Sequence, residues 1–199
     1  MPRDPALERL WAPWRGAYIA GETAKARRAR TGSRAEPTAE QCLFCRVGKG
    51  SADRADLVVT RRESAFLMLN RYPYNPGHLM VAVLRHTAEF ASLTGVERQD
   101  LLDLVGVAER LLAASYHPDG VNYGANVGRV AGAGFPGHLH LHLVPRWNGD
   151  TNFMPIVART KVLPESLAST WKRLRLGLGR DAARASRAPR ASRRRRRGA

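Results

Sequence analysis

Three histidines alternate with leucines near the middle of the chain, and imidazole is a side chain that can do chemistry at neutral pH. His138, His140 and His142 stand at every second position. In a β-strand such residues project from one face, and the residues between them project from the other. The spacing therefore predicts a strand that carries a row of imidazoles on one face and packs its leucines into a core. A solvated row, a metal site and a catalytic site are all compatible with it, and three imidazoles in register favour catalysis.

Cys42 and Cys45 form a Cys-x-x-Cys pair, and the chain has no other cysteine. Two thiolates at this spacing can bind one tetrahedral metal ion, most often zinc, if two more ligands come from elsewhere. A redox-active dithiol is the alternative, although no thioredoxin-like pattern surrounds the pair. Two close cysteines are too few for the disulfide framework of a small secreted protein.

The elements that would position these residues follow from apolar patterning. Short strands are expected at 57–60, 65–69, 78–84 and 121–127, before the histidine strand at 138–144 and an edge segment at 151–157. Thr94 and Glu97 have the spacing of a capping box, which predicts a long helix that ends before His117. A final helix is expected from Pro164 onward. Strands in hairpin succession with a helix between them indicate an antiparallel α+β domain.

Composition divides the chain into four parts. Residues 1–20 are expected to form a short helix and an anchor built on Trp11 and Trp14, and 21–41 a mobile basic linker. The domain itself is expected at 42–179. Residues 180–199 are expected to be a disordered, arginine-rich tail.

The net charge of +16 is concentrated at the end of the chain. Residues 180–199 contain nine arginines and one aspartate, so nine minus one gives +8 there. Such a tail could bind RNA or another polyanion through its phosphates without sequence preference, or it could only aid solubility. No apolar run has the length of a membrane-spanning helix and the first residues lack an apolar signal core, which favours a cytoplasmic protein without membrane contact.

A glycine-rich loop, residues 128–134, leads into the histidine strand. Small residues allow backbone N–H groups to approach a phosphate group closely. The loop is therefore a candidate phosphate site, and an ordinary hairpin connection is the alternative.

The pattern His-x-His-x-His-x-x, with apolar residues at each x, resembles the histidine triad (HIT) superfamily and matches every position from His138 to Val144. The segments 70–81, 126–147 and 149–153 are similar to its diadenosine tetraphosphate phosphorylase, or ATP adenylyltransferase, branch. The resemblance implies a HIT-like antiparallel sheet of about five strands with one long helix and a C-terminal helix, in a homodimer.

The same resemblance implies an enzyme that cleaves dinucleoside polyphosphates or nucleoside phosphate conjugates, with adenine favoured, at the α-phosphorus. His140 would be the nucleophile that forms a covalent nucleotidyl-histidine, and His142 would orient it or carry protons. The remaining positions implied to bind substrate are Asn70 for the ribose, His78 in a supporting role, and Asn126, Gly128, Arg129 and Gly134 for phosphate. No organic cofactor is implied.

The chain departs from the family pattern in two places. Many members have Ser or Gln shortly before the triad, whereas residues 133–137 here offer no such side chain. Several phosphorylases and uridylyltransferases have Gln at the third triad position, whereas this chain has His142. The choice between phosphate and water as the second acceptor therefore stays open.

Zinc-containing relatives use a Cys-x-x-Cys pair, a histidine after the central strand and the first triad histidine. The corresponding residues here are Cys42, Cys45, His86 and His138, so the resemblance implies a structural Zn²⁺ site. Under this reading His138 fixes the strand instead of carrying protons. Cysteines without a metal are the alternative.

Overall fold

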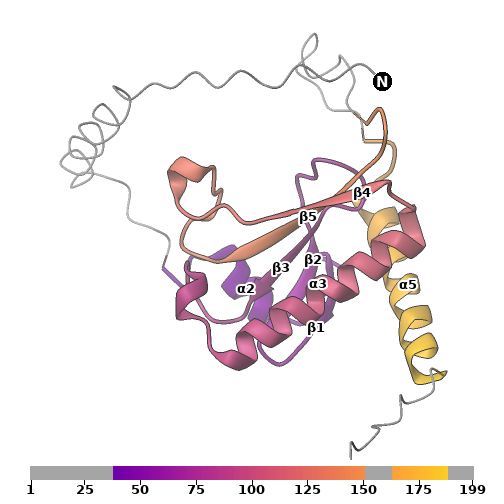
Figure 1. Ribbon diagram of the computed structural model, residues 1–199. Coiled ribbons are helices and arrows are strands. Elements are labelled where there is room, and N and C mark those ends of the chain that lie inside the picture. Colours follow the sequence, from indigo (N-terminus) through magenta and orange to yellow (C-terminus); the bar gives the residue numbers. More distant parts are fainter. Residues whose placement is uncertain (1–37, 151–162, 188–199) are drawn as a thin grey trace, which may run out of the picture. The chain divides into compact units, whose positions relative to one another are not determined.

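A computed structural model describes residues 38–150 and 163–187 (Figure 1). The expected N-terminal helix and tryptophan anchor, the linker up to residue 37, the edge segment at 151–157 and the tail after residue 187 lie outside the described residues.

The described part is built on one five-stranded antiparallel sheet, as the sequence predicted. Its strands are β1 (Val58–Arg61), β2 (Ala65–Leu69), β3 (Leu79–Val83), β4 (Gly120–Gly124) and β5 (His140–Arg146). They lie in the order β1-β2-β3-β5-β4, so the histidine strand is between β3 and the edge strand β4 (Figure 1). All five residues of β3 are buried, as expected for the central strand of the sheet.

Helix α3 (Gly95–Tyr116) begins at the predicted capping box. The Glu97 N–H donates to Thr94 Oγ1 (3.2 Å), and the Thr94 N–H donates to Glu97 Oε2 (2.9 Å). Arg85, just after β3, donates to both carboxylate oxygens of Glu97 at 2.8 Å. The ion pair joins the end of the central strand to the start of the long helix. The helix ends at His117, which adopts the left-handed conformation (φ 46°).

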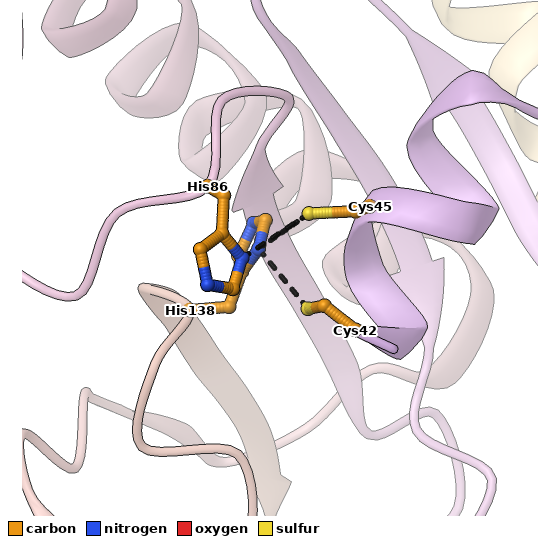
Figure 2. A group of neighbouring side chains, drawn as sticks. All are labelled: Cys42, Cys45, His86 and His138. Atoms are coloured by element: carbon orange, nitrogen blue, oxygen red, sulfur yellow. Dashed lines mark hydrogen bonds between the residues drawn. The ribbon is translucent and has the colours of Figure 1, made fainter. Parts of the chain in front are cut away.

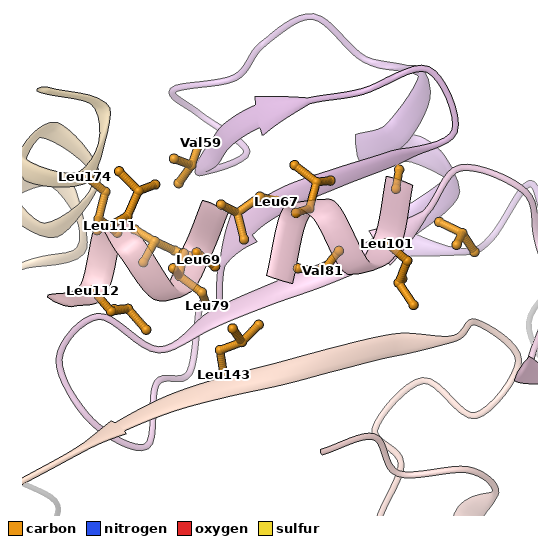
Figure 3. Packing of buried hydrophobic residues seen from close by; sticks show 14 of the residues in the cluster. Val59, Leu67, Leu69, Leu79, Val81, Leu101, Leu111, Leu112, Leu143 and Leu174 are labelled. Atoms are coloured by element: carbon orange, nitrogen blue, oxygen red, sulfur yellow. The ribbon is translucent and has the colours of Figure 1, made fainter. Parts of the chain in front are cut away.

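One face of the sheet packs against α3 and the C-terminal helix α5 (Leu167–Arg187) (Figure 3). Leu67, Val81 and Leu143 project from the strands toward Leu111 and Leu174 of the two helices. Burying each such leucine contributes roughly 1.5–3 kcal/mol through removal of apolar surface from water. The alternating leucines of β5 therefore anchor the histidine strand.

The other face carries a smaller core under the short helix α2 (Leu43–Lys49). Phe44 and Val47 of this helix pack on Phe66 of β2 and on Met80 and Ala82 of β3. Helix α2 packs on β1, β2 and β3 on this face. The histidines of β5 lie on the same face of the sheet, next to the part that α2 covers.

Several strand boundaries differ from the sequence predictions by one to three residues. Two differences have a local physical reason. Strand β5 starts at His140, not at His138, because residues 135–138 close a turn through the His138 N–H and the Phe135 carbonyl (3.3 Å). Helix α5 continues to Arg187, past the expected domain end at 179, since the segment is rich in the strong helix formers alanine and arginine. None of the described helices is long and apolar enough to cross a membrane.

Candidate functional site

Four side chains converge beside the start of β5 to form a candidate metal site (Figure 2). Cys42 caps α2 and Cys45 lies in its first turn, while His86 follows β3 and His138 precedes β5. Their ligand atoms all lie within 4.8 Å of one another. The cluster is made of exactly the residues that the sequence resemblance implied, although they come from three separate segments of the chain.

The hydrogen bonds of His138 prepare it to donate a lone pair to a metal ion. Its Nε2 lies 2.8 Å from the Val83 carbonyl oxygen, which can only accept, so we assign the proton to Nε2. The Nδ1 lone pair then faces the sulfur atoms of Cys42 (3.4 Å) and Cys45 (3.5 Å). His86 Nδ1 lies 3.2 Å from Cys45 Sγ. Two sulfur and two imidazole donors in a buried cluster fit the ligand set of tetrahedral zinc.

His140 is held so that one ring nitrogen faces the substrate side. Its Nδ1 lies 2.8 Å from the His138 carbonyl oxygen, so Nδ1 carries the proton and Nε2 keeps a free lone pair. Phe44 of α2 stacks on the ring, with centroids 4.5 Å apart. Burial lowers the pKa of His140, which keeps the imidazole neutral and nucleophilic at neutral pH.

His142 is linked to a fourth histidine. The Tyr74 backbone N–H donates to His78 Nδ1 (3.1 Å), so His78 carries its proton on Nε2. His78 Nε2 lies 2.9 Å from His142 Nδ1 and donates to it. This places the proton of His142 on Nε2. Burial, followed by the nearby histidines, lowers the pKa of His78 to about 3 and that of His142 to about 4.

The chain thus presents two neutral imidazoles of opposite character on one face of β5, their centroids 5.0 Å apart. His140 offers a lone pair at Nε2, and His142 offers an N–H at Nε2. A nucleophile next to a hydrogen-bond donor suits displacement at an electrophilic centre with developing negative charge.

A pocket of about 270 Å³, here called the first pocket, opens onto both histidines. Apolar side chains of α2 and the sheet form much of its lining, among them Leu43, Phe44, Val47, Met68 and Met80. Polar side chains also line it, among them Asn70 and Asn126. A flat aromatic group would fit between the apolar walls, because such pockets bury most of a ligand's surface.

The predicted substrate residues divide into two groups. Asn70, Asn126 and Gly134 line the first pocket. His78 does not line it, but it is hydrogen-bonded to His142, which does. Gly128 and Arg129 line neither this pocket nor its neighbour described below. Gly128 has φ +84°, a backbone conformation that favours glycine at this turn into the loop.

Several site residues had escaped the sequence reasoning. Phe44 and Tyr74 both contact the histidines, and Arg46 pairs with Asp56 (3.0 Å) in the lining of the first pocket. Phe44 lies between the two cysteines and Tyr74 is four residues before His78. The sequence could have indicated these two aromatic residues only through their closeness to Cys42, Cys45 and His78.

A family model described as the HIT domain matches residues 52–149. Among characterised proteins, an AP-4-A phosphorylase of Mycobacterium tuberculosis is 39% identical over 164 residues, covering 82% of this chain and 80% of the relative. An adenosine 5'-monophosphoramidase of Schizosaccharomyces pombe is 31% identical over 107 residues, covering 54% of this chain and 75% of the relative.

Among solved structures, a zinc-bound histidine triad family protein of Mycobacterium smegmatis superimposes with a TM-score of 0.59 at 25% identity, covering 73% of this chain and 99% of that one. The family model, the sequence relatives and the fold agree, and two of these relatives are named as enzymes. The chain belongs to the histidine triad (HIT) family.

Proposed function

We propose that this protein cleaves dinucleoside polyphosphates of the diadenosine tetraphosphate type at the α-phosphorus through a covalent nucleotidyl-His140 intermediate. The observation that carries the proposal is the opposite protonation of two neighbouring rings, with a lone pair on His140 Nε2 and a proton on His142 Nε2. The names of the AP-4-A phosphorylase and the monophosphoramidase support adenine nucleotides as the substrate class.

In the first step the His140 Nε2 lone pair forms an N–P bond, and the bond from the α-phosphorus to the bridging oxygen breaks. The leaving polyphosphate takes the electron pair of that bond, and the His142 N–H supports or protonates its oxygen. The ring of His140 becomes cationic, and its Nδ1–H already donates to the His138 carbonyl, which stabilises this charge. In the second step an acceptor oxygen attacks phosphorus and the N–P bond breaks.

The remaining residues hold the substrate. The apolar lining of the first pocket would bind the adenine base, and Asn70 would contact the ribose. Asn126 and the backbone near Gly134 would bind the phosphate oxygens, because both line the pocket that His140 and His142 also line. Phosphate and water both remain candidates for the second acceptor.

The decisive experiment incubates the protein with diadenosine tetraphosphate, with and without inorganic phosphate, and resolves the products. ADP and ATP that form only with phosphate indicate phosphorolysis, whereas AMP and ATP indicate hydrolysis. Quenching the wild type with an alkaline denaturant should trap a nucleotidyl adduct, which acid treatment should then release. His140→Ala should abolish turnover and adduct, and His117→Asn, a histidine change in the turn after α3, should keep both. Turnover by His140→Ala would refute the proposal.

We further propose a structural zinc ion at Cys42, Cys45, His86 and His138. When bound it would tie α2 to the start of β5, and it would leave His138 without a proton-carrying role. The cluster geometry and the zinc-bound relative support this assignment.

We propose a homodimer as the working unit, because β4 is an edge strand that pairs only with β5 in the described part of the chain. Light scattering of the purified protein over a dilution series tests it. The cytoplasmic location inferred from the sequence stays a prediction.

Binding of RNA or another polyanion is the second candidate function. It is favoured by a groove of about 500 Å³ that is lined by Arg110 of α3 and by Arg173 and Arg180 of α5. Helix α5 leads into the arginine-rich segment. Replacing Arg193–Arg197 by glutamine in the full chain should weaken RNA retention at low salt. Equal retention by both proteins across a salt series would remove this candidate.

A further inference from the structure

A second pocket, of about 370 Å³, adjoins the first. Tyr74, Asn126 and His142 line both pockets, whereas His140 lines only the first. The ring of His142 therefore stands where the two pockets meet, and the second pocket extends from it away from the nucleophile along β4 and β5.

The far wall of the second pocket is held by a connected set of hydrogen bonds. Arg146 donates to both carboxylate oxygens of Asp150 (2.6 and 2.8 Å) and, through its third donor group, to Asn122 Oδ1 (2.9 Å). Asn75, which is only 4% exposed, donates to Asp150 Oδ2 and to the Pro145 carbonyl, both at 2.9 Å. A wall with this many charge-assisted and buried bonds is preformed, so a ligand would lose little entropy in ordering it.

The chemistry of the lining suits a nucleoside more than a phosphate chain. The Asp150 carboxylate neutralises Arg146, so the pocket does not present a free cation for an anion. Amide groups of Asn122 and Asn126 offer donors and acceptors of the kind that match base edges and ribose hydroxyls. Val144 adds an apolar surface, and the volume lies in the usual range for small-molecule pockets of about 300–1,000 Å³.

The geometry of the proposed displacement places the leaving group toward the second pocket. Displacement at phosphorus places the attacking and leaving atoms roughly in line, so the leaving group departs on the side away from His140. His142 would meet the leaving oxygen with its N–H, and the second pocket begins at the same ring, because His142 lines both pockets. A nucleotide that leaves past His142 would bring its own nucleoside to this lining.

We propose that the second pocket binds the nucleoside of the departing nucleotide, so that the protein selects substrates with a nucleoside at both ends. The proposal rests on the function proposed above, in that the first nucleoside occupies the first pocket. It assigns Asn122, Val144 and the Arg146–Asp150 pair to substrate selection.

A filling substitution tests the assignment. Val144 lies on β5 opposite Asn122, and Val144→Phe would occupy the floor of the second pocket, whereas Val144→Thr keeps the side-chain size. The probes are AMP and a diadenosine tetraphosphate analogue with methylene bridges, measured by calorimetry. Wild type and Val144→Thr should bind the analogue at least about tenfold more tightly than AMP, a difference of about 1.4 kcal/mol. In Val144→Phe the affinity for the analogue should fall to about that for AMP.

Turnover provides the second readout. For Val144→Phe, KM for diadenosine tetraphosphate should rise about tenfold more than KM for the 4-nitrophenyl ester of AMP, whose leaving group has no nucleoside. If Val144→Phe does not fold, as judged by its melting curve, Asn122→Ala replaces it and should lower the affinity for the analogue more than that for AMP.

The outcomes separate this proposal from the proposed function. Equal affinities of wild type for AMP and the analogue, or equal losses for both ligands in the variants, would overturn the second pocket as a nucleoside site. Turnover by His140→Ala would instead overturn the proposed chemistry, while the selective binding of the analogue would stand.

Discussion

His78 Nε2 lies 2.9 Å from His142 Nδ1, and this bond sets the protonation of the reactive side of the site. His78 precedes β3 and is fully buried, and the Tyr74 N–H leaves it only one nitrogen to protonate. As a result, His142 must present its own proton toward the pockets. A residue that lines neither pocket therefore determines which nitrogen of His142 carries the proton.

His78→Phe should expose this positioning role. An aromatic ring is kept, but His142 loses the donor that fixes its tautomer and its orientation, so its Nε2–H is no longer held toward the leaving oxygen. We expect kcat for diadenosine tetraphosphate to fall roughly 10–100-fold, in line with the loss of a proton-transfer contribution. KM should change by less than about threefold.

The matched control is His117→Asn, which removes a histidine from a turn and keeps a side chain that tolerates the left-handed conformation. An unchanged kcat in His78→Phe, or a loss confined to KM, would show that the histidine pair does not set the reactive proton.

Stability should fall as the solution is acidified from pH 6.5 toward pH 4. The folded-state pKa values of His78 and His142, about 3 and about 4, lie below the unfolded value of 6.5, so the unfolded chain binds more protons in this window. Their contribution is fully present above pH 6.5 and is lost as the pH falls. Each histidine contributes a slope of up to about 1.4 kcal/mol per pH unit.

Urea unfolding at pH 7, 6 and 5 measures this slope. His78→Phe removes one of the two groups, so the variant should lose less stability than the wild type over the same pH interval. Parallel curves for the two proteins would show that His78 does not titrate with folding.

Removal of a metal ligand should weaken both the fold and nucleotide binding. Burial raises the pKa of the Cys45 thiol to about 11, so metal binding must displace a proton, and metal affinity should rise with pH. Cys45→Ser should lose stoichiometric zinc in elemental analysis and lower the melting temperature. Because α2 also carries Phe44, which stacks on His140, AMP affinity should fall as well.

Gln41→Ala is the matched control, since Gln41 is exposed in the same segment and offers no ligand atom to the cluster. It should retain zinc and AMP affinity. A Cys45→Ser protein that binds one equivalent of zinc as tightly as the wild type would contradict the proposed ligand set.

Local patterns were sufficient to predict the framework. The alternation of leucine and histidine predicted the strand face, and Thr94 with Glu97 predicted the start of α3, because both depend on residues close together in the sequence. The metal cluster needed the family resemblance, since nothing local links Cys42 to His86 or His138.

Contacts between distant polar side chains could not be predicted in this way. The Asn75–Asp150 and His78–His142 bonds join residues far apart in the chain, and they depend on register and side-chain rotamers that carry no periodic signal. Helix α5 continues from residue 179 to Arg187 for a different reason, because alanine and arginine both favour helix although their charge is also typical of a tail.

The pairing of β5 also protects the site against misalignment of the strand. A slip by one residue would turn every histidine into the apolar core and every leucine toward the pockets. The slip by two that brings Pro145 opposite Leu79 would restore the faces, but it would place in the ladder with β3 a residue that has no N–H to donate. The one-residue slips and this two-residue slip are thus disfavoured by two different penalties, which limits the ways in which the strand can misalign during folding.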